Sequence, residues 1–180
     1  MTKKISDFKV GQKFRSEFDK MTRDLIKDYA EASGDKNPIH IREEVAKKAG
    51  LKGVIAHGLL SFGFIVKLLD KQVKGNGKVT GVYGQMRGKV RPGDTLITEL
   101  EVTSIEDKTV QFDVLQKTVT KVEIEKDGEV VKMFEAGERG WISDKDREKG
   151  YLKQKKLDEG TLIYRVRPCI LGSASIQINK

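Results

Sequence analysis

The segment HGLLSFGFIVKLLDKQV, residues 57–73, constrains the fold of this chain more than any other part of its sequence. A helix that is apolar nearly all round must be surrounded by other elements on most sides. Lys67 and Asp70 interrupt the stretch, which is also too short to span a bilayer. The sequence therefore predicts a long, central, buried helix and no membrane partner. The apolar residues behind this prediction are Leu59, Leu60, Phe62, Phe64, Ile65, Val66, Leu68 and Leu69.

The sequence after Gly75 has the pattern of β-strands. Residues 95–103 and 109–116 alternate apolar with polar side chains, which is the period of a half-buried strand. A further run meets Asp127-Gly128, a strong hairpin signal, and we expect residues 129–142 to return as a strand. One long apolar helix followed by antiparallel meander strands favours an α+β fold with the sheet wrapped around the helix. Because such a sheet has an exposed edge, we expect two copies to pair as a homodimer.

The N-terminal part contains shorter elements. Residues 5–14 indicate a short strand or extended lead-in. Thr22 is suited to cap a helix that runs to about Ala32, and Gly34 suits the left-handed position that ends it. A second short helix is expected over residues 43–49.

The length of 180 residues fits one domain with an appendage. We place the main domain at residues 1–143. Residues 144–160 are charged and poor in strand-forming residues, which indicates a linker or an exposed helix. Strand-like segments follow around Pro168 and Gly172, so residues 144–180 are interpreted as a charged linker and a C-terminal extension of unknown role.

Composition restricts the class of protein and its partners. Hydrophobic residues make up 37% and charged residues 34% of the chain, as expected of a soluble globular protein. The net charge of +8 is scattered, which indicates a solvated surface and favours anionic partners such as nucleotide phosphates or an acidic carrier protein. Zinc-ligand spacing and aromatic-basic RNA-binding patterns are absent, so we expect no nucleic-acid partner. Cys169 is the single cysteine, and the N-terminus lacks a signal-peptide core; both predict a cytoplasmic protein.

The loop GDKNPIH, residues 34–40, carries the candidate chemistry. Its Asn-Pro turn folds the segment back, so that Asp35 and His40 are able to converge on one water molecule. Two such groups can remove a proton from water and return a proton to a substrate carbon. Gly58, at the start of the long helix, offers an unpaired backbone N–H and room for a carbonyl oxygen, as an oxyanion site requires.

Purely structural interpretations of these residues stay open at this level. Asp35 and Asn37 are common turn residues, a histidine at position 40 can be satisfied by backbone groups, and Gly58 can serve packing alone. His57 has two interpretations, one in shaping the oxyanion site and one in packing the helix start.

The combined motifs resemble the signature of the MaoC-like, or R-specific enoyl-CoA hydratase (hydratase 2), family. The resemblance rests on YAEASGDKNPIH (residues 29–40), followed by Ala46, IAHGLLS and VRPGDTL in the family order, and it covers roughly residues 5–143. It implies a hot-dog fold, in which an antiparallel sheet wraps one long helix. It also implies reversible hydration of trans-2-enoyl thioesters to R-3-hydroxyacyl thioesters, without a metal or an organic cofactor.

The resemblance further assigns roles to individual residues. Asp35 and His40 become the catalytic pair, and the Gly58 N–H binds the thioester oxygen, with His57 and Asn37 as weaker candidates at the substrate site. The sequence departs from the family where some hydratases carry a serine two turns into the helix, because Val66 stands there, and GQMRGKV replaces a bulky series before VRPGD.

Two other functions compete with the hydratase: a hot-dog acyl-CoA thioesterase and a non-catalytic module that binds acyl thioesters. The loop 34–40 argues against both. The sequence leaves open whether coenzyme A or acyl carrier protein bears the acyl group, and how long that group is.

Overall fold

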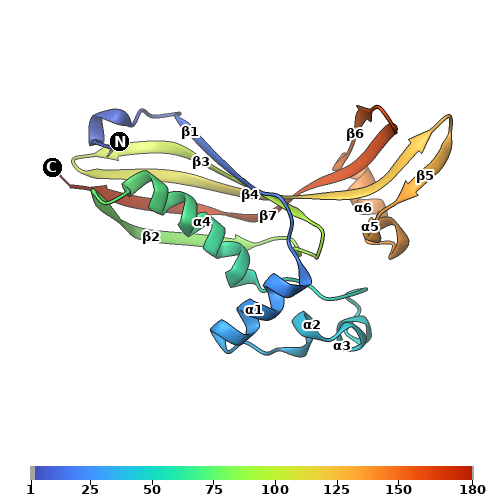
Figure 1. Cartoon of the computed structure of the whole chain (residues 1–180). Helices are drawn as coiled ribbons and strands as arrows, with labels where there is room; N and C mark the ends of the chain where they lie inside the picture. Colours follow the sequence, from blue (N-terminus) through green and yellow to red (C-terminus); the bar gives the residue numbers. More distant parts are fainter. Residues whose placement is uncertain (1–2, 180) are drawn as a thin grey trace.

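The computed structural model describes residues 3–179 and consists of one sheet, one long helix and several short helices (Figure 1). The sheet has seven strands, all paired antiparallel: five follow the order β1-β3-β4-β7-β2, while β5 pairs with β4 and β6 pairs with β7. The strands are β1 (Lys13–Phe18), β2 (Gly77–Met86), β3 (Thr95–Glu106), β4 (Thr109–Lys126), β5 (Glu129–Met133), β6 (Leu152–Leu157) and β7 (Gly160–Ile178). The predicted α+β hot-dog fold is confirmed.

The helix α4 (Gly58–Val73) lies against one face of the sheet and contacts β2, β7 and β3, and alternate residues of β4 belong to the same face (Figure 1). Leu100, Phe112 and Ile176 on these strands are buried against it together with Ile65 and Leu69 of the helix. The prediction that α4 is surrounded on most sides is wrong within a single chain. One face of the helix is open to solvent, where Leu59 is 64% exposed and Val66 is 38% exposed. The sheet covers only the opposite face of the helix.

The helices that precede α4 form a small layer beside its N-terminal end: α1 (Arg23–Ser33), α2 (Pro38–Ile41) and α3 (Glu43–Lys48) (Figure 1). Thr22 caps α1 as predicted, since its hydroxyl accepts a hydrogen bond from the N–H of Leu25 at 3.1 Å. Gly34 ends α1 with φ of 75°, a left-handed conformation that glycine adopts without strain. The predicted helix at 43–49 is confirmed as α3. The lead-in is η1 (Ile5–Asp7) followed by β1, so a strand beginning at residue 5 was wrong.

The long strands β4 and β7 continue past α4 and form an arm with β5, β6, α5 (Glu135–Glu138) and α6 (Asp144–Glu148) (Figure 1). The Asp127-Gly128 hairpin is confirmed, with positive φ at both residues. The return strand is shorter than expected, because β5 ends at Met133. Phe134 is the N-cap residue of α5, and Ala136 of this helix is buried. A Cβ at Gly137 would lie 2.9 Å from the Val122 carbonyl oxygen, so this position favours glycine.

Residues 144–180 extend the sheet. Ser143 starts α6 through a capping box with Asp146, and β6 follows where a linker or a longer exposed helix was predicted. Strand β7 lies between β4 and β2 and passes without interruption through Pro168 and Gly172. The register of β4 and β7 shifts beside Pro168, which has no N–H to donate. The role that the sequence left open for residues 160–178 is therefore that of a strand inside the sheet.

Candidate active site

The loop between α1 and α2 brings three predicted site residues together. Asp35, His40 and His57 each offer one carboxylate oxygen or ring nitrogen, and these three atoms lie within 4.8 Å of one another. Asp35 follows the C-cap of α1, His40 lies in the single turn of α2, and His57 is the N-cap residue of α4. The loop with α2 and the start of α4, which are separate in the sequence, thus meet at one place.

The hydrogen bonds of the two histidines fix their tautomers. His40 donates through Nδ1 to the carbonyl oxygen of Ile55 at 2.8 Å, because a carbonyl only accepts. The Nε2 atom of neutral His40 consequently carries a lone pair. His57 donates through Nε2 to the backbone carbonyl of Asp35 at 2.9 Å, which leaves its Nδ1 as an acceptor. Nδ1 of His57 is buried and has no hydrogen-bond partner among the described residues.

Burial and neighbouring charge act on His40. Its partly buried position lowers the pKa of the imidazole below the ordinary 6.5, opposed by the hydrogen bond to Ile55. A protonated His57 ring nearby would lower this pKa further, while the Asp35 carboxylate raises it. The neutral, proton-accepting form of His40 is therefore favoured at neutral pH.

Asn37 and Gly58 complete the set of predicted site residues. The Asn37 side chain accepts a hydrogen bond from the N–H of Ile39 at 3.3 Å, so it caps α2. Gly58 is the first residue of α4, where the helix supplies no carbonyl partner for its N–H. A Cβ at position 58 would lie 2.2 Å from the Sδ atom of Met86, so the thioether of Met86 covers this glycine.

Three residues at the site were not identified from the sequence. The ring of Tyr29 packs on His57 with centroids 4.9 Å apart, the Ile55 carbonyl orients His40, and Met86 reaches Gly58 from the end of β2. Tyr29 is the first residue of the motif YAEASGDKNPIH (residues 29–40), but the motif alone does not relate it to His57. Nothing in the sequence relates Met86 to Gly58, because the sheet topology alone brings them together.

The same three side chains form a donor set that a divalent transition metal accepts, one carboxylate with two imidazoles. Nε2 of His40 and Nδ1 of His57 are the free ring nitrogens. The expectation of a metal-free site stays a prediction.

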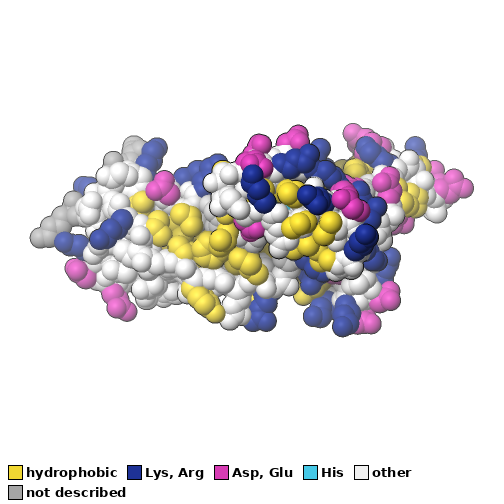
Figure 2. All heavy atoms as spheres, turned by 90° about the horizontal axis from the view of Figure 1, so that it is seen from below, with side chains coloured by type: hydrophobic (Ala, Val, Ile, Leu, Met, Phe, Trp, Pro, Cys, Tyr) yellow, Lys and Arg dark blue, Asp and Glu magenta, His cyan; other side chains and the backbone are white. Residues whose placement is uncertain are grey.

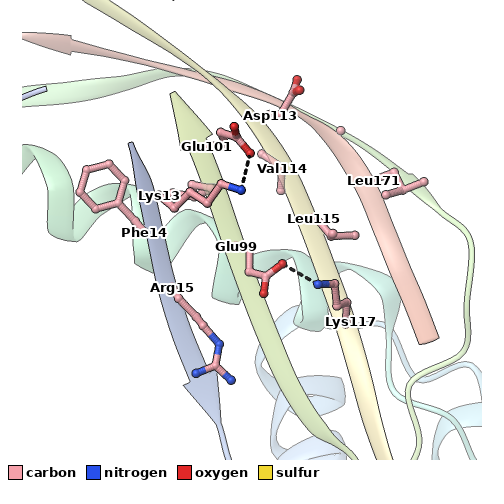
Figure 3. A pocket seen from close by; sticks show the side chains of 12 residues that line it. Lys13, Phe14, Arg15, Glu99, Glu101, Asp113, Val114, Leu115, Lys117 and Leu171 are labelled. Atoms are coloured by element: carbon pink, nitrogen blue, oxygen red, sulfur yellow. Dashed lines mark hydrogen bonds and ion pairs between the residues drawn. The ribbon is translucent and has the colours of Figure 1, made fainter. Parts of the chain in front are cut away.

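A separate hollow of about 730 Å³ lies on the other face of the sheet, where β1, β3, β4 and β7 present their outward side chains (Figure 3). Asp113, Leu115 and Lys117 point into it, and they alternate along β4 with residues that face α4. Its charges largely satisfy one another, as in the Lys117–Glu99 pair at 2.6 Å. The sheet separates this hollow from the histidines, so it is not part of the candidate active site.

Comparisons with known proteins show which sequences and folds this chain resembles. The family model described as MaoC like domain matches residues 7–126. The (R)-specific enoyl-CoA hydratase of Rhodospirillum rubrum is 35% identical over 106 residues, which are 57% of this chain and 74% of that protein. The peroxisomal enoyl-CoA hydratase 2 of Arabidopsis thaliana is 46% identical over 70 residues, which are 38% of this chain but only 23% of that protein.

Solved structures share the fold at low sequence identity. The unliganded R-hydratase PhaJ1 from Pseudomonas aeruginosa superposes with a TM-score of 0.67 at 20% identity, over 98% of this chain and 86% of that one. Some relatives are much longer proteins, and this chain spans 7% of the peroxisomal hydratase-dehydrogenase-epimerase of Neurospora crassa. The region shared with that protein is thus a small part of it.

Proposed function

Because the chain belongs to the MaoC-like domain family, we propose that it hydrates trans-2-enoyl thioesters reversibly to R-3-hydroxyacyl thioesters. The observation that carries the proposal is the convergence of Asp35 and His40, with the free Nε2 of His40 facing the same site. The relatives named as hydratases support the reaction class.

The proton chemistry follows from the tautomer of His40. Its Nε2 lone pair accepts a proton from a water molecule that the Asp35 carboxylate holds in place. The water oxygen bonds to C3 of the enoyl group, and the electron pair of the double bond moves toward the thioester. The proton taken from water is then returned to C2 on the same face, so that one water adds across the double bond without other reactants. The two groups exchange protons as a coupled unit.

Negative charge develops on the thioester oxygen as the C3–O bond forms. The N–H of Gly58 is free to donate to that oxygen, and the positive end of α4 lies behind it. A preorganised donor of this kind stabilises the transition state more than the ground state. His57 and Asn37 act indirectly, since His57 holds the Asp35 backbone and Asn37 caps α2.

The test is turnover of crotonyl-CoA, followed as loss of the conjugated enoyl absorbance, with the configuration of the 3-hydroxybutyryl product determined. We expect the R product from the unaltered chain and no measurable turnover by Asp35→Asn or His40→Ala. Asp28→Asn, the same chemical change on the exposed side of α1, is the matched control and should retain activity. Retained activity in either site variant contradicts the assignment, and release of free thiol instead identifies a thioesterase.

We also propose that the protein acts as a homodimer in the cytoplasm, on thioesters of coenzyme A or acyl carrier protein. Leu59 and Val66 of α4 and Met86 of β2 are exposed apolar side chains, and β2 ends the sheet with one edge open. Figure 2 shows hydrophobic side chains gathered on the face seen from below. A monomeric mass in light scattering would contradict the dimer. Among residues 3–179, no helix has the length and apolar character needed to cross a membrane.

A further inference from the structure

A second hollow, of about 250 Å³, lies where the arm meets the loop that follows α3. Its walls come from residues 50–52, the segment 89–91 and residues 140–146, with β7 at its base. Five of its lining residues are cationic: Lys52, Lys89, Arg91, Arg165 and Arg167. An adjoining hollow of about 430 Å³ shares Arg167 and adds three more cations, Arg87, Lys145 and Lys149. Much of this basic surface lies outside residues 7–126, the part matched by the family model.

Two of the guanidinium groups are buried with donors left over. Arg91 is 7% exposed and Arg165 is 3% exposed, and both line the hollow. Nη1 of Arg91 and Nε of Arg165 have no hydrogen-bond partner among the described residues. Buried donors without acceptors are destabilising by about 1–3 kcal/mol each, and more for charged groups. An acceptor on a bound ligand would satisfy both donors.

The acidic groups near the hollow are already engaged. Among the described lining residues, Asp146 is the acid, and it accepts hydrogen bonds from Ser143 at 2.8 Å while lying 3.5 Å from Arg165. Asp94 is fully buried behind the wall, where Thr120 donates to it at 2.6 Å and the Arg91 backbone N–H at 2.8 Å. Positive charge therefore exceeds negative charge in the hollow.

The cations that face one another also repel. Burial lowers the pKa of Arg91; Asp94 opposes this effect, while Arg165, Arg139 and Arg167 lower the pKa further. The ring of Trp141 stacks against the Arg91 guanidinium at 4.6 Å and holds it in place. A polyvalent anion would relieve the repulsion and satisfy the free donors together.

A backbone hydrogen bond joins the wall of the hollow to the segment that directly precedes the candidate active site. The N–H of Ala56 donates to the carbonyl of Val90 at 2.8 Å. Val90 stands between two cationic lining residues, Lys89 and Arg91, and Ala56 directly precedes His57. The wall of the hollow and the start of α4 are therefore neighbours in the fold, as a single ligand with its reactive group at the histidines and its charged end in the hollow requires.

We propose that this basic hollow binds a phosphate group of a nucleotide, and that in the hydratase reaction it is a phosphate of the coenzyme A part of the substrate. The assignment of coenzyme A rests on the proposed function, whereas the phosphate site itself does not. Arg91 and Arg165 supply the buried donors, and Lys89 and Arg167 supply charge at the entrance.

The test compares two thioesters that differ in the nucleotide. Crotonyl-CoA carries the phosphates, and crotonyl-pantetheine presents the same enoyl thioester without them. The double variant Lys89→Gln/Arg167→Gln alters the less buried cations and spares Arg91 and Arg165, whose replacement endangers folding. Its matched control, Lys9→Gln/Lys126→Gln, removes two exposed positive charges elsewhere. Calorimetry of the same proteins with free coenzyme A and with inorganic phosphate measures binding without turnover.

We expect the Lys89/Arg167 double variant to raise the KM for crotonyl-CoA by roughly tenfold or more, since each lost contact is a charge-assisted one. The KM for crotonyl-pantetheine should not change, and the control should match the unaltered protein with both substrates. If the KM values stay equal while inorganic phosphate binding is lost in the variant, the hollow serves a free phosphate compound. The proposal is overturned if calorimetry detects no binding of phosphate or coenzyme A by the unaltered protein, or equal binding by the unaltered protein and the Lys89/Arg167 double variant. It is also overturned if the variant raises the KM for both thioesters by the same factor. Failure of crotonyl-CoA turnover in the unaltered protein would refute the hydratase function, and the calorimetry would still decide the phosphate site.

Discussion

The imidazole rings of His40 and His57 are stacked, with centroids 3.8 Å apart and planes inclined by 30°. The two rings come from different elements, α2 and the N-terminus of α4. His57 also donates to the backbone carbonyl of Asp35, so one buried ring contacts both members of the proposed catalytic pair. The position of the loop relative to the helix is set by this contact.

Replacement of His57 by alanine should therefore lower kcat without removing a reacting group. Loss of the buried hydrogen bond to Asp35 is worth about 1–3 kcal/mol, which corresponds to a decrease in kcat of roughly tenfold to a hundredfold. Steady-state kinetics with crotonyl-CoA measures the effect. Tyr29→Phe keeps the ring that packs on His57 and serves as the control, which should stay near the unaltered rate. A kcat unchanged in His57→Ala would show that the contact does not position the loop.

The pH dependence of kcat/KM should report on His40. Burial lowers the pKa of His40 below 6.5, and only the neutral ring accepts a proton from water. The activity should accordingly hold steady as the pH falls through 6.5 and decline only at lower pH. In His57→Ala, the loss of the stacked ring reduces the burial of His40 and so raises its pKa, and the decline should begin at a higher pH. If kcat/KM of the unaltered protein already declines above pH 6.5 as the pH is lowered, the role of neutral His40 as the base is contradicted.

The sequence predicted the site in part because its main members lie on one short motif. Thr22, Gly34 and Asn37-Pro38 determine local backbone geometry, so the ends of α1 and the turn before His40 follow from neighbouring residues. The contact between Met86 and Gly58 depends instead on how β2 pairs with β7, a relationship of distant segments. Local patterns carry no information about such a contact.

The arm shows the same limit at the level of the fold. Residues 152–157 have the sequence LKQKKL, whose charged centre led to the prediction of a linker or an exposed helix. In the structure these residues form β6, which pairs with β7. Pro168 and Gly172 resemble strand ends when read alone. In the structure, Gly172 is required because a Cβ there would lie 1.9 Å from the Tyr83 carbonyl oxygen of β2. Beside Pro168, which has no N–H, the register between β4 and β7 shifts, and the two strands pair again on either side. Sheet pairing overrode the local signals in both places.

Gly58→Ala should leave the protein folded and reduce its activity. The added methyl displaces only the end of the flexible Met86 side chain, and alanine favours a helix over glycine by up to about 1 kcal/mol. The methyl also narrows the approach of the thioester oxygen to the free N–H. The N–H itself remains in the variant, but a thioester oxygen held out of its reach loses the hydrogen bond, so kcat should fall by up to about a hundredfold to a thousandfold.

A second glycine of α4 provides the control for this substitution. A Cβ at Gly63 meets nothing within 4 Å, so Gly63→Ala should keep both stability and activity. Thermal unfolding and crotonyl-CoA kinetics of the two variants separate folding from catalysis. Equal activity of Gly58→Ala and Gly63→Ala would remove Gly58 from the oxyanion site. Met86→Ala in the Gly58→Ala background should not restore activity, since the clash with Met86 is not the cause of the loss.

A chain that ends at residue 143 should fail to fold, although the family match ends well before that point. Strand β7 pairs with β4 from Thr161 to Gln177 and with β2 from Ile170 to Ile178. Its removal detaches β2 from the sheet and strips the core of buried residues such as Ile176. Unpaired backbone groups would then remain along both β4 and β2.

We expect the shortened chain to show no cooperative thermal transition when unfolding is measured by circular dichroism. Addition of a peptide covering residues 160–180 should restore the transition if the missing strand is the cause. A cooperative transition of the shortened chain at the temperature of the full chain would instead establish residues 1–143 as an independent domain.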